Sequence, residues 1–365
     1  MLTGRATVEG TARWAERARS AGRVAPGHYR RSAGDLTLTS LGVGTYLGAP
    51  DAATDRAVEE AVGVSIVSGR VNVVDTAHNY RYQKAERAVG RALARAVAAG
   101  RVEREAVFVS TKVGYLAPDG DANEPPSDWL RRHLIEPGVL AEDEIVDGCH
   151  ALAPRFVEDQ VERCRQNLGL ETIDLVYLHN AADQQLAAVG PTEFRRRLAA
   201  AFAALERLRR DGRVGAYGIA SWDAFRVPPG APGHASLEEI AGLARTAGSP
   251  GLAMVQFPFN RAMPEARLLP TQPVGGTVHP LFEAAGALGI ACMTSVPLLQ
   301  GRFAAGRAPV GGLTAAQGAL QIARSATAST TALVGQKRVE HVAENLHVAE
   351  VAPLAPDEVA RLLRA

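Results

Sequence analysis

The fold is decided by the stretch Val71-Asn72-Val73-Val74-Asp75-Thr76-Ala77-His78-Asn79-Tyr80. Its first half has the short, β-branched composition of a buried strand, and the acidic Asp75 follows at once. Tyr80 stands five residues further on, just outside the predicted strand. If this is a strand of a parallel α/β barrel, both side chains lie at the rim where such folds carry out their chemistry.

Seven other short apolar or β-branched runs are also expected to be strands, and longer helical patterns alternate with them. The eight expected strands are residues 40–45, 71–75, 107–112, 173–179, 216–221, 253–257, 291–295 and 331–335. Helical patterns occupy residues 55–68, 84–99, 156–168, 193–210, 236–247, 314–326 and 356–363. Eight strand–helix units in series predict a closed (β/α)8 TIM barrel.

A doubly wound open sheet is the competing fold. It would have a Gly-x-Gly-x-x-Gly turn after an early strand, where a dinucleotide binds. Here Gly42-Val43-Gly44 is followed by Thr45-Tyr46-Leu47, which is not that pattern. The barrel is therefore the preferred prediction.

Two segments lie outside the repeat. Residues 1–35 are polar and rich in arginine, and we expect them to form an N-terminal extension to a barrel of residues 36–365. Residues 115–153, after the third strand, form an insertion rich in Pro, Asp and Gly. Loops of this length in compact domains are usually functional or disordered. The insertion is therefore expected to be a lid or pocket wall, with a surface decoration as the alternative.

Composition narrows the class of protein. The 365 residues include 40 basic and 39 acidic side chains, a formal net charge of +1, which argues against a general nucleic-acid binder. Three cysteines without a Cys-x-x-Cys pair argue against a disulfide framework or structural zinc. No apolar run has the length of a membrane span, and the N-terminus lacks a signal-peptide core. We expect a cytoplasmic protein without a metal; the oligomeric state is not predictable.

Four titratable side chains follow consecutive predicted strands. Asp75, Lys112 and His179 end the second, third and fourth strands, and Tyr80 lies on the loop after the second. Each alone has an ordinary structural explanation, such as a turn residue or a solvated charge. Together they suggest proton donation to a carbonyl. A phenol has a pKa near 10, and a neighbouring ammonium lowers that pKa, so Lys112 would tune Tyr80 while Asp75 holds Lys112. His179 would orient the substrate oxygen.

These residues stand in motifs that resemble the aldo-keto reductase family. The motifs are Asp75-Thr76-Ala77-x-x-Tyr80, Ser110-Thr111-Lys112 and Asp174-Leu175-Val176-Tyr177-Leu178-His179, and Glu86 and Gly90 match the helix pattern that follows. The resemblance covers roughly residues 29 to 350. It implies reversible NAD(P)H-dependent reduction of a small aldehyde or ketone, with Tyr80 as the acid.

The resemblance also implies where the coenzyme binds. Ser221 and Gln256 would contact the nicotinamide, the loop after Ser295 would wrap the pyrophosphate, and Glu344 and Asn345 would contact the adenine. Lys337 and Arg338 favour the 2′-phosphate of NADPH, with NADH as the alternative. The full expected set is Ser221, Gln256, Ser295, Pro297, Leu298, Gly301, Arg302, Gly335, Lys337, Arg338, His341, Glu344 and Asn345. Each also has a structural explanation as a cap, a turn or a solvated helix start.

Three positions depart from the better-known members of that family. Ser295 stands where an aromatic residue often stacks on the nicotinamide, Arg81 replaces a glycine after the tyrosine, and His341 replaces an arginine or glutamine. The long C-terminal substrate loop of some members is missing, so the insertion is expected to take over its role. The expected pocket walls are Tyr46, His78, Tyr115, Trp129, Asn180 and Phe257.

Other functions fit the same motifs. The reaction direction is open, so an NAD(P)-dependent sugar or alcohol dehydrogenase is possible. A nucleotide-binding regulatory subunit on the same fold is a further alternative, since such relatives can keep the four residues. Metal-dependent hydrolysis is weakly supported, because the sequence has no His-x-His pair beside His78, His179 and Asp75.

Overall fold

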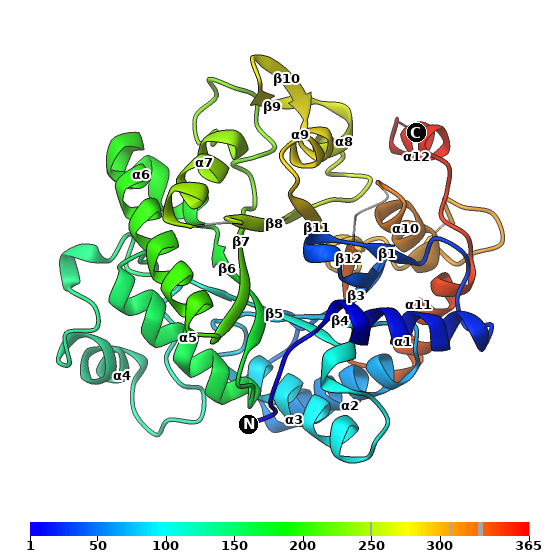
Figure 1. The fold of residues 1–365 in the computed structure, drawn as a ribbon, viewed down its shortest axis with the longest axis horizontal. Helices are drawn as coiled ribbons and strands as arrows, with labels where there is room; N and C mark the ends of the chain where they lie inside the picture. Colours follow the sequence, from blue (N-terminus) through cyan, green and yellow to red (C-terminus); the bar gives the residue numbers. More distant parts are fainter. Residues whose placement is uncertain (249, 307, 328–330, 365) are drawn as a thin grey trace.

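The computed structural model describes residues 1–248, 250–306, 308–327 and 331–364. Eight parallel strands close into a barrel in the order β11-β12-β3-β4-β5-β6-β7-β8, with helices around the outside (Figure 1). The strands are β3 (Leu41–Gly44), β4 (Val73–Asp75), β5 (Phe108–Val113), β6 (Ile173–His179), β7 (Val214–Ala220), β8 (Leu252–Pro258), β11 (Ala291–Ser295) and β12 (Thr331–Gly335). The predicted TIM barrel is confirmed, and three strands have the predicted bounds.

The main helices follow the strands that they cover. They are α2 (Ala52–Val67), α3 (Lys84–Ala98), α5 (Pro154–Leu168), α6 (Ala181–Arg210), α7 (Leu237–Ala247), α9 (Leu281–Ala287), α10 (Ala315–Arg324), α11 (Val339–His347) and α12 (Pro356–Arg364). Local chemistry sets several of their ends. The Asp51 carboxylate accepts a hydrogen bond from the Thr54 amide at the start of α2, and Gly169 ends α5 in the left-handed conformation.

Gly90 shows why a motif residue of α3 is a glycine. A Cβ at this position would lie 2.6 Å from the carbonyl oxygen of Leu168 at the end of α5. Only glycine allows the two helices to approach this closely. The contact fixes α3 against the barrel, and α3 begins directly after the loop that carries Tyr80.

Strand register brings the polar strand ends to one rim. Asp75 pairs in register with Ser110 on β5, and Lys112 pairs with Tyr177 on β6. His179 pairs with Ala220, which in turn pairs with Gln256 on β8. These positions therefore share the mouth of the barrel, as the parallel arrangement requires.

The N-terminal segment packs on the opposite end of the barrel. It contains α1 (Val8–Ser20) and β1 (Tyr29–Arg31), and β1 pairs with β2 (Thr37–Thr39). The Ala6 amide donates to the Asp174 carboxylate at 2.6 Å, and the Thr7 amide donates to the Glu105 carbonyl at 3.1 Å. A boundary at residue 35 falls inside the β1–β2 hairpin, so this extension is integrated with the barrel.

Two further additions decorate the repeat. The hairpin β9 (Pro270–Val274) and β10 (Thr277–Pro280) and the short helix α8 (Glu265–Leu268) precede β11. The insertion after β5 contains α4 (Pro126–Leu130) and has a small separate core, formed by its residues Trp129, Leu134, Leu140 and Ala151 against Phe156 of α5. No helix among the described residues has both the length and the apolarity to cross a membrane.

Candidate active site

Lys112 is the centre of the polar cluster at the barrel mouth. Its Nζ lies 2.5 Å from Oδ2 of Asp75, 3.1 Å from the hydroxyl of Tyr80 and 2.9 Å from the carbonyl oxygen of Thr76. The Lys112 side chain is 1% exposed, so these contacts replace water almost completely. The strand ends predicted from the sequence therefore meet as expected.

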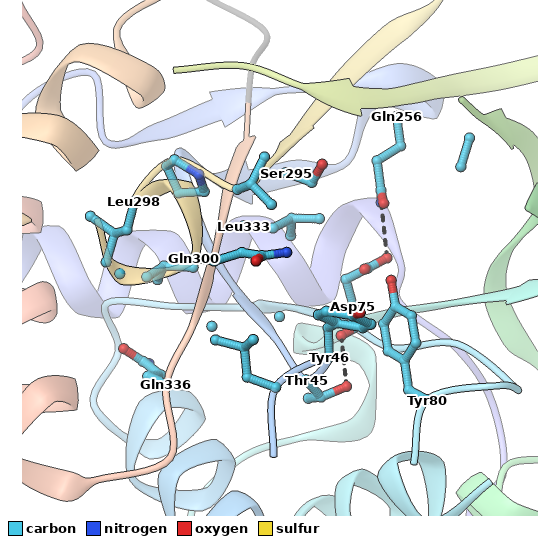
Figure 2. A pocket seen from close by; sticks show the side chains of 18 of the residues that line it. Thr45, Tyr46, Asp75, Tyr80, Gln256, Ser295, Leu298, Gln300, Leu333 and Gln336 are labelled. Atoms are coloured by element: carbon cyan, nitrogen blue, oxygen red, sulfur yellow. Dashed lines mark hydrogen bonds between the residues drawn. The ribbon is translucent and has the colours of Figure 1, made fainter. Parts of the chain in front are cut away.

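Asp75 is held by neighbours on both sides. Its Oδ1 accepts hydrogen bonds from the Ser110 hydroxyl at 2.7 Å and from the Gln256 amide at 3.1 Å. Figure 2 shows Gln256 reaching across the barrel to Asp75, with the Tyr80 hydroxyl beside that carboxylate. A carboxylate with three charged or polar donors is fixed in place, and it fixes the position of Lys112 in turn.

Burial and charge act against each other on Lys112. Burial disfavours the cation, but Asp75 and Tyr80 stabilise it, and the net result raises the pKa of Lys112 above its ordinary value. Lys112 is therefore a cation at neutral pH. This charge next to the phenol is what the motif predicted.

The pKa of Tyr80 differs from the sequence-based expectation. Burial raises the pKa of Tyr80, and the opposing effect of Lys112 is smaller, so the phenol titrates above its ordinary range. The expected lowering was wrong for this structure because the hydroxyl is buried together with the lysine. Tyr80 therefore keeps its proton at neutral pH, which a proton donor requires.

His179 lies between two tyrosines. Its ring packs edge-on against Tyr80 at 5.8 Å and against Tyr115 at 5.0 Å between centroids. Burial, Lys112 and His150 hold the pKa of His179 well below its ordinary range, so the imidazole is neutral. Its Nδ1 has no hydrogen-bond partner among the described residues. A neutral imidazole carries one N–H, which suits it to donating to a substrate oxygen.

A single cavity of about 670 Å³ extends from these residues along the barrel mouth. Its lining includes Tyr80 and His179 and also the basic residues Lys337, Arg338 and His341. Figure 2 shows Ser295, Leu298, Gln300 and Leu333 along one side of it. A cavity of this size is typical of sites for cofactors and other small molecules.

The Aldo/keto reductase family model matches residues 40–309. The chain belongs to the aldo/keto reductase family. A curated relative, the NADH-specific methylglyoxal reductase of Escherichia coli (strain K12), is 27% identical over 197 residues, which cover 53% of this chain. The matched region spans about half of that relative's length (51%).

Solved structures of the family have the same fold. An aldo-keto reductase from Bacillus halodurans in its holo form matches with a TM-score of 0.61 and 18% identity, covering 92% of this chain and 96% of that one. An aldo-keto reductase from Klebsiella pneumoniae in complex with NADPH matches with a TM-score of 0.60 and 17% identity, covering 92% and 94%. At this level of identity the likeness concerns the fold.

Most of the site residues expected for an aldo/keto reductase line the cavity. Beside Asp75, Tyr80 and His179, the expected positions that line it are Tyr46, Tyr115, Asn180, Ser221, Gln256, Ser295, Pro297, Leu298, Gly301, Gly335, Lys337, Arg338 and His341. Lys112 itself lies directly beneath this surface. Ser221 also caps the following turn, because its hydroxyl accepts from the Ala224 amide at 3.0 Å.

Three expected coenzyme contacts in this family member lie elsewhere. Asn345 is buried behind the cavity wall, where its amide donates to Gln336 at 2.8 Å. Glu344 accepts from the Thr314 hydroxyl at 2.7 Å, and that bond ties α11 to α10. Arg302 is exposed beyond η5 (Leu299–Gly301) and is not among the described residues that line the cavity. Asn345 therefore supports the wall indirectly, through Gln336.

Three expected pocket walls were also wrong. Phe257 follows Gln256 on β8 and so faces the opposite side of the sheet, where it packs on Phe282 at 5.1 Å. Trp129 is 4% exposed in the separate core of the insertion. His78 points toward the outer helices, with Nδ1 3.4 Å from Glu86 and 3.6 Å from the Cys164 sulfur.

The His78–Glu86–Cys164 group is fully buried, and its ligand-type atoms lie within 4.8 Å of one another. Glu86 is already satisfied without an ion, because it accepts from Thr111 at 2.6 Å and from Asn167 at 2.9 Å. Burial opposes the charge on Glu86, yet His78 and the other hydrogen bonds lower the pKa of this carboxyl. The group is therefore a hydrogen-bond network beneath the loop that carries Tyr80.

Sequence reasoning missed several residues of the wall. They are Gly44, Thr45, Leu47, Asn79, Ala220, Trp222, Val296, Gln300, Ala304, Leu333, Val334 and Gln336. Most of them stand within one or two positions of an expected site residue or of a strand end. Their position at the rim could have predicted them as wall residues, whereas their residue types alone do not indicate a binding site.

Proposed function

We propose that this protein reduces a small aldehyde or ketone to an alcohol, with Tyr80 donating the proton to the carbonyl oxygen. The observation that carries the proposal is the position of the Lys112 ammonium, 3.1 Å from the Tyr80 hydroxyl and 2.5 Å from Asp75, next to two residues that line the cavity. Family membership and the NADH-specific methylglyoxal reductase relative support carbonyl reduction.

Each side chain has a separate role in this proposal. The protonated Tyr80 hydroxyl donates to the carbonyl oxygen, and Lys112 stabilises the phenolate that results. Asp75 keeps the Lys112 ammonium in position. The neutral His179 donates a second hydrogen bond and orients the carbonyl. NADPH supplies the hydride when it is bound, and the reverse reaction, alcohol oxidation, uses the same groups.

The residues around the cavity fit a dinucleotide. The exposed cations Lys337 and Arg338 and the imidazole of His341 line the cavity, where they suit the 2′-phosphate of NADPH. Ser221 and Gln256 line the same cavity as Tyr80, and Gln256 donates to Asp75. NADH is the second candidate coenzyme, because the curated relative is named for it. The three cysteines are free thiols, which supports the proposed cytoplasmic location.

Tyr80→Phe tests the proposal. The change removes the proton donor and keeps the ring, so turnover of a carbonyl substrate found by screening an aldehyde panel should fall about 10²- to 10⁴-fold. The dissociation constant for NADPH should change little. A variant that turns over at the wild-type rate refutes the role of Tyr80. Tight NADPH binding by the wild type without oxidation by any carbonyl would favour the regulatory-subunit alternative.

A further inference from the structure

The turn after Tyr80 has a backbone that is rare for its residues. Arg81, Tyr82 and Gln83 have φ angles of 50°, 54° and 70°. This left-handed region is disfavoured for residues with a Cβ, and three of them in succession accumulate strain. Glycine adopts the same angles without that strain. Such a conformation persists only where surrounding contacts hold it.

The first part of the insertion supplies backbone contacts to this turn. The Gly120 amide donates to the Tyr82 carbonyl at 3.0 Å, and the Gln83 side-chain amide donates to the Ala117 carbonyl at 3.0 Å. A Cβ on Gly120 would lie 2.9 Å from the Tyr82 carbonyl oxygen. The close approach therefore depends on glycine, which suggests that residues 117–121 are shaped to fit the turn.

Ion pairs join the same segment to the first two turns of α3. Lys84 Nζ lies 2.5 Å from Asp121. The Arg87 guanidinium binds both oxygens of Asp119, at 2.6 and 2.8 Å, and also contacts Asp121 at 2.5 Å. The hydrogen bond to Asp121 is the main cause that raises the pKa of Lys84, and Lys84 in turn lowers the pKa of Asp121. Residues 84 and 87 are thus anchored directly beyond the strained turn.

A second contact holds the turn from the side of α2. Arg81 is 6% exposed and forms an ion pair with Asp55, which also lies 3.3 Å from Lys84. The other nitrogens of Arg81, Nε and Nη2, have no hydrogen-bond partner within the part of the chain that the structure describes. Asp55 is therefore the ion-pair partner on which the position of Arg81 depends.

We propose that residues 117–121 form a brace that positions the Tyr80 hydroxyl, with Lys84, Asp119 and Asp121 as positioning residues. The brace acts through the turn at residues 81–83, which joins Tyr80 directly to α3. Without it the turn can relax, and the Tyr80 ring moves with the turn. The inference rests on the proposed role of Tyr80 as proton donor. It gives the insertion a role in catalysis that differs from that of a lid.

In this proposal the brace maintains the 3.1 Å distance between Lys112 Nζ and the Tyr80 hydroxyl. Lys112 sits on a barrel strand and is fixed by Asp75, whereas the Tyr80 hydroxyl extends from a loop. A displacement of the loop therefore changes this distance, while the strand side stays in place. Displacements of about 1 Å at reacting groups can cost roughly 10²-fold in rate. A partial loosening should thus lower kcat and leave the KM of the substrate unchanged.

The test is a double-mutant cycle at the brace. Asp121→Asn and Lys84→Met should each lower kcat, by roughly three- to tenfold, with the KM of the substrate and the dissociation constant of NADPH unchanged. The double variant should lose less than the product of the two single losses, because both changes break the contact between Lys84 and Asp121, while Lys84 also lies near Asp55 and Asp121 also binds Arg87. Asp121→Glu, which keeps the carboxylate, should restore most of kcat. Added salt should lower kcat in the wild type more than in Asp121→Asn.

Glu124→Gln is the matched control. Glu124 lies in the same insertion and pairs with Arg132 at 3.1 Å, away from the turn. Its loss should leave kcat at the wild-type level. The brace is refuted if Asp121→Asn and Lys84→Met change only the thermal unfolding midpoint, or if Glu124→Gln lowers kcat as much as they do. Full turnover by Tyr80→Phe would instead refute the proton-donor role, and it is measured separately.

Discussion

Asp75→Asn removes one negative charge from the buried partner of Lys112 and keeps the shape of the side chain. The two groups lie 2.5 Å apart, with side chains 1% and 4% exposed. Removing one partner of a buried pair leaves an uncompensated charge and typically costs about 3–5 kcal/mol of unfolding free energy. A domain near the middle of the usual stability range of about 5–15 kcal/mol stays folded after that loss at room temperature.

The pH dependence of this loss identifies its cause. In the wild type the folded pKa of Lys112 is raised above its ordinary value of 10.5, so the stabilisation by the pair is fully present below pH 10.5. In the variant, burial acts without the carboxylate and lowers the folded pKa of Lys112 below the unfolded value. At pH values between the folded and the unfolded pKa of Lys112, the unfolded variant then binds more protons than the folded one. Its stability should therefore rise with pH, and the deficit relative to wild type should shrink.

Urea unfolding at pH 7 and pH 9.5 measures this deficit, and Asp174→Asn is the matched control. Asp174 is also a buried carboxylate, paired with Arg104 at 2.8 Å, but it lies at the opposite end of the barrel. Arg104 does not lose its proton between pH 7 and pH 9.5, so the stability deficit of Asp174→Asn should not shrink with pH. Asp75→Asn should also lower kcat by about 10²-fold or more, whereas Asp174→Asn should not. Equal deficits at both pH values for Asp75→Asn would refute the reasoning.

The remaining predictions concern titration and coenzyme choice. Burial holds the pKa of His179 well below its ordinary value and the pKa of Tyr80 above its ordinary value. We therefore expect kcat/KM for reduction to be flat between about pH 6 and about pH 9. A fall in kcat/KM centred near pH 6.5 would contradict this. Burial lowers the pKa of His28 from 6.5 to about 3, so the unfolded chain takes up a proton first in acid. The unfolding free energy should therefore drop by about 2 kcal/mol from this residue at pH 5, and urea unfolding should show a smaller acid loss in His28→Gln. Lys337→Ala and Arg338→Ala should each raise the KM for NADPH by about tenfold with little change for NADH, and equal effects on both coenzymes would contradict a 2′-phosphate site.

The barrel and its reactive rim were predictable for a common reason. Parallel strands buried on both faces are continuous apolar runs, and polar residues at their ends stand out against them. Asp75 and His179 end their strands and Lys112 is the next-to-last residue of β5, so the topology alone brings the three together. The geometry of a closed parallel sheet does not depend on the loops. These positions can therefore be predicted without any knowledge of the loop structure.

Pocket walls were less predictable because side-chain direction is a tertiary property. Phe257 and Gln256 are neighbours on one strand, yet one faces the helices and the other faces the cavity. A slip of one residue in the expected register reverses that choice. The prediction for Trp129 was wrong for a different reason: a long insertion can form a separate core against a neighbouring helix, here α5, and nothing in its composition indicates that.

The turn at residues 81–83 shows the limit most clearly. Left-handed backbone is usually signalled by glycine or asparagine, and Arg81, Tyr82 and Gln83 carry neither signal. The sequence showed that Arg81 departs from the family pattern, but it did not show that the glycine-like conformation is kept. That conformation is enforced from outside, by Asp55 and by a segment more than thirty residues away in the chain. The local preference of these residues against left-handed backbone angles conflicts with the tertiary structure at this turn. Such conflicts concentrate at functional sites, and there the surrounding contacts have to outweigh the local preference. The departure at Arg81 and the insertion after β5 are therefore best understood together, since the first creates a strain that contacts from the second offset.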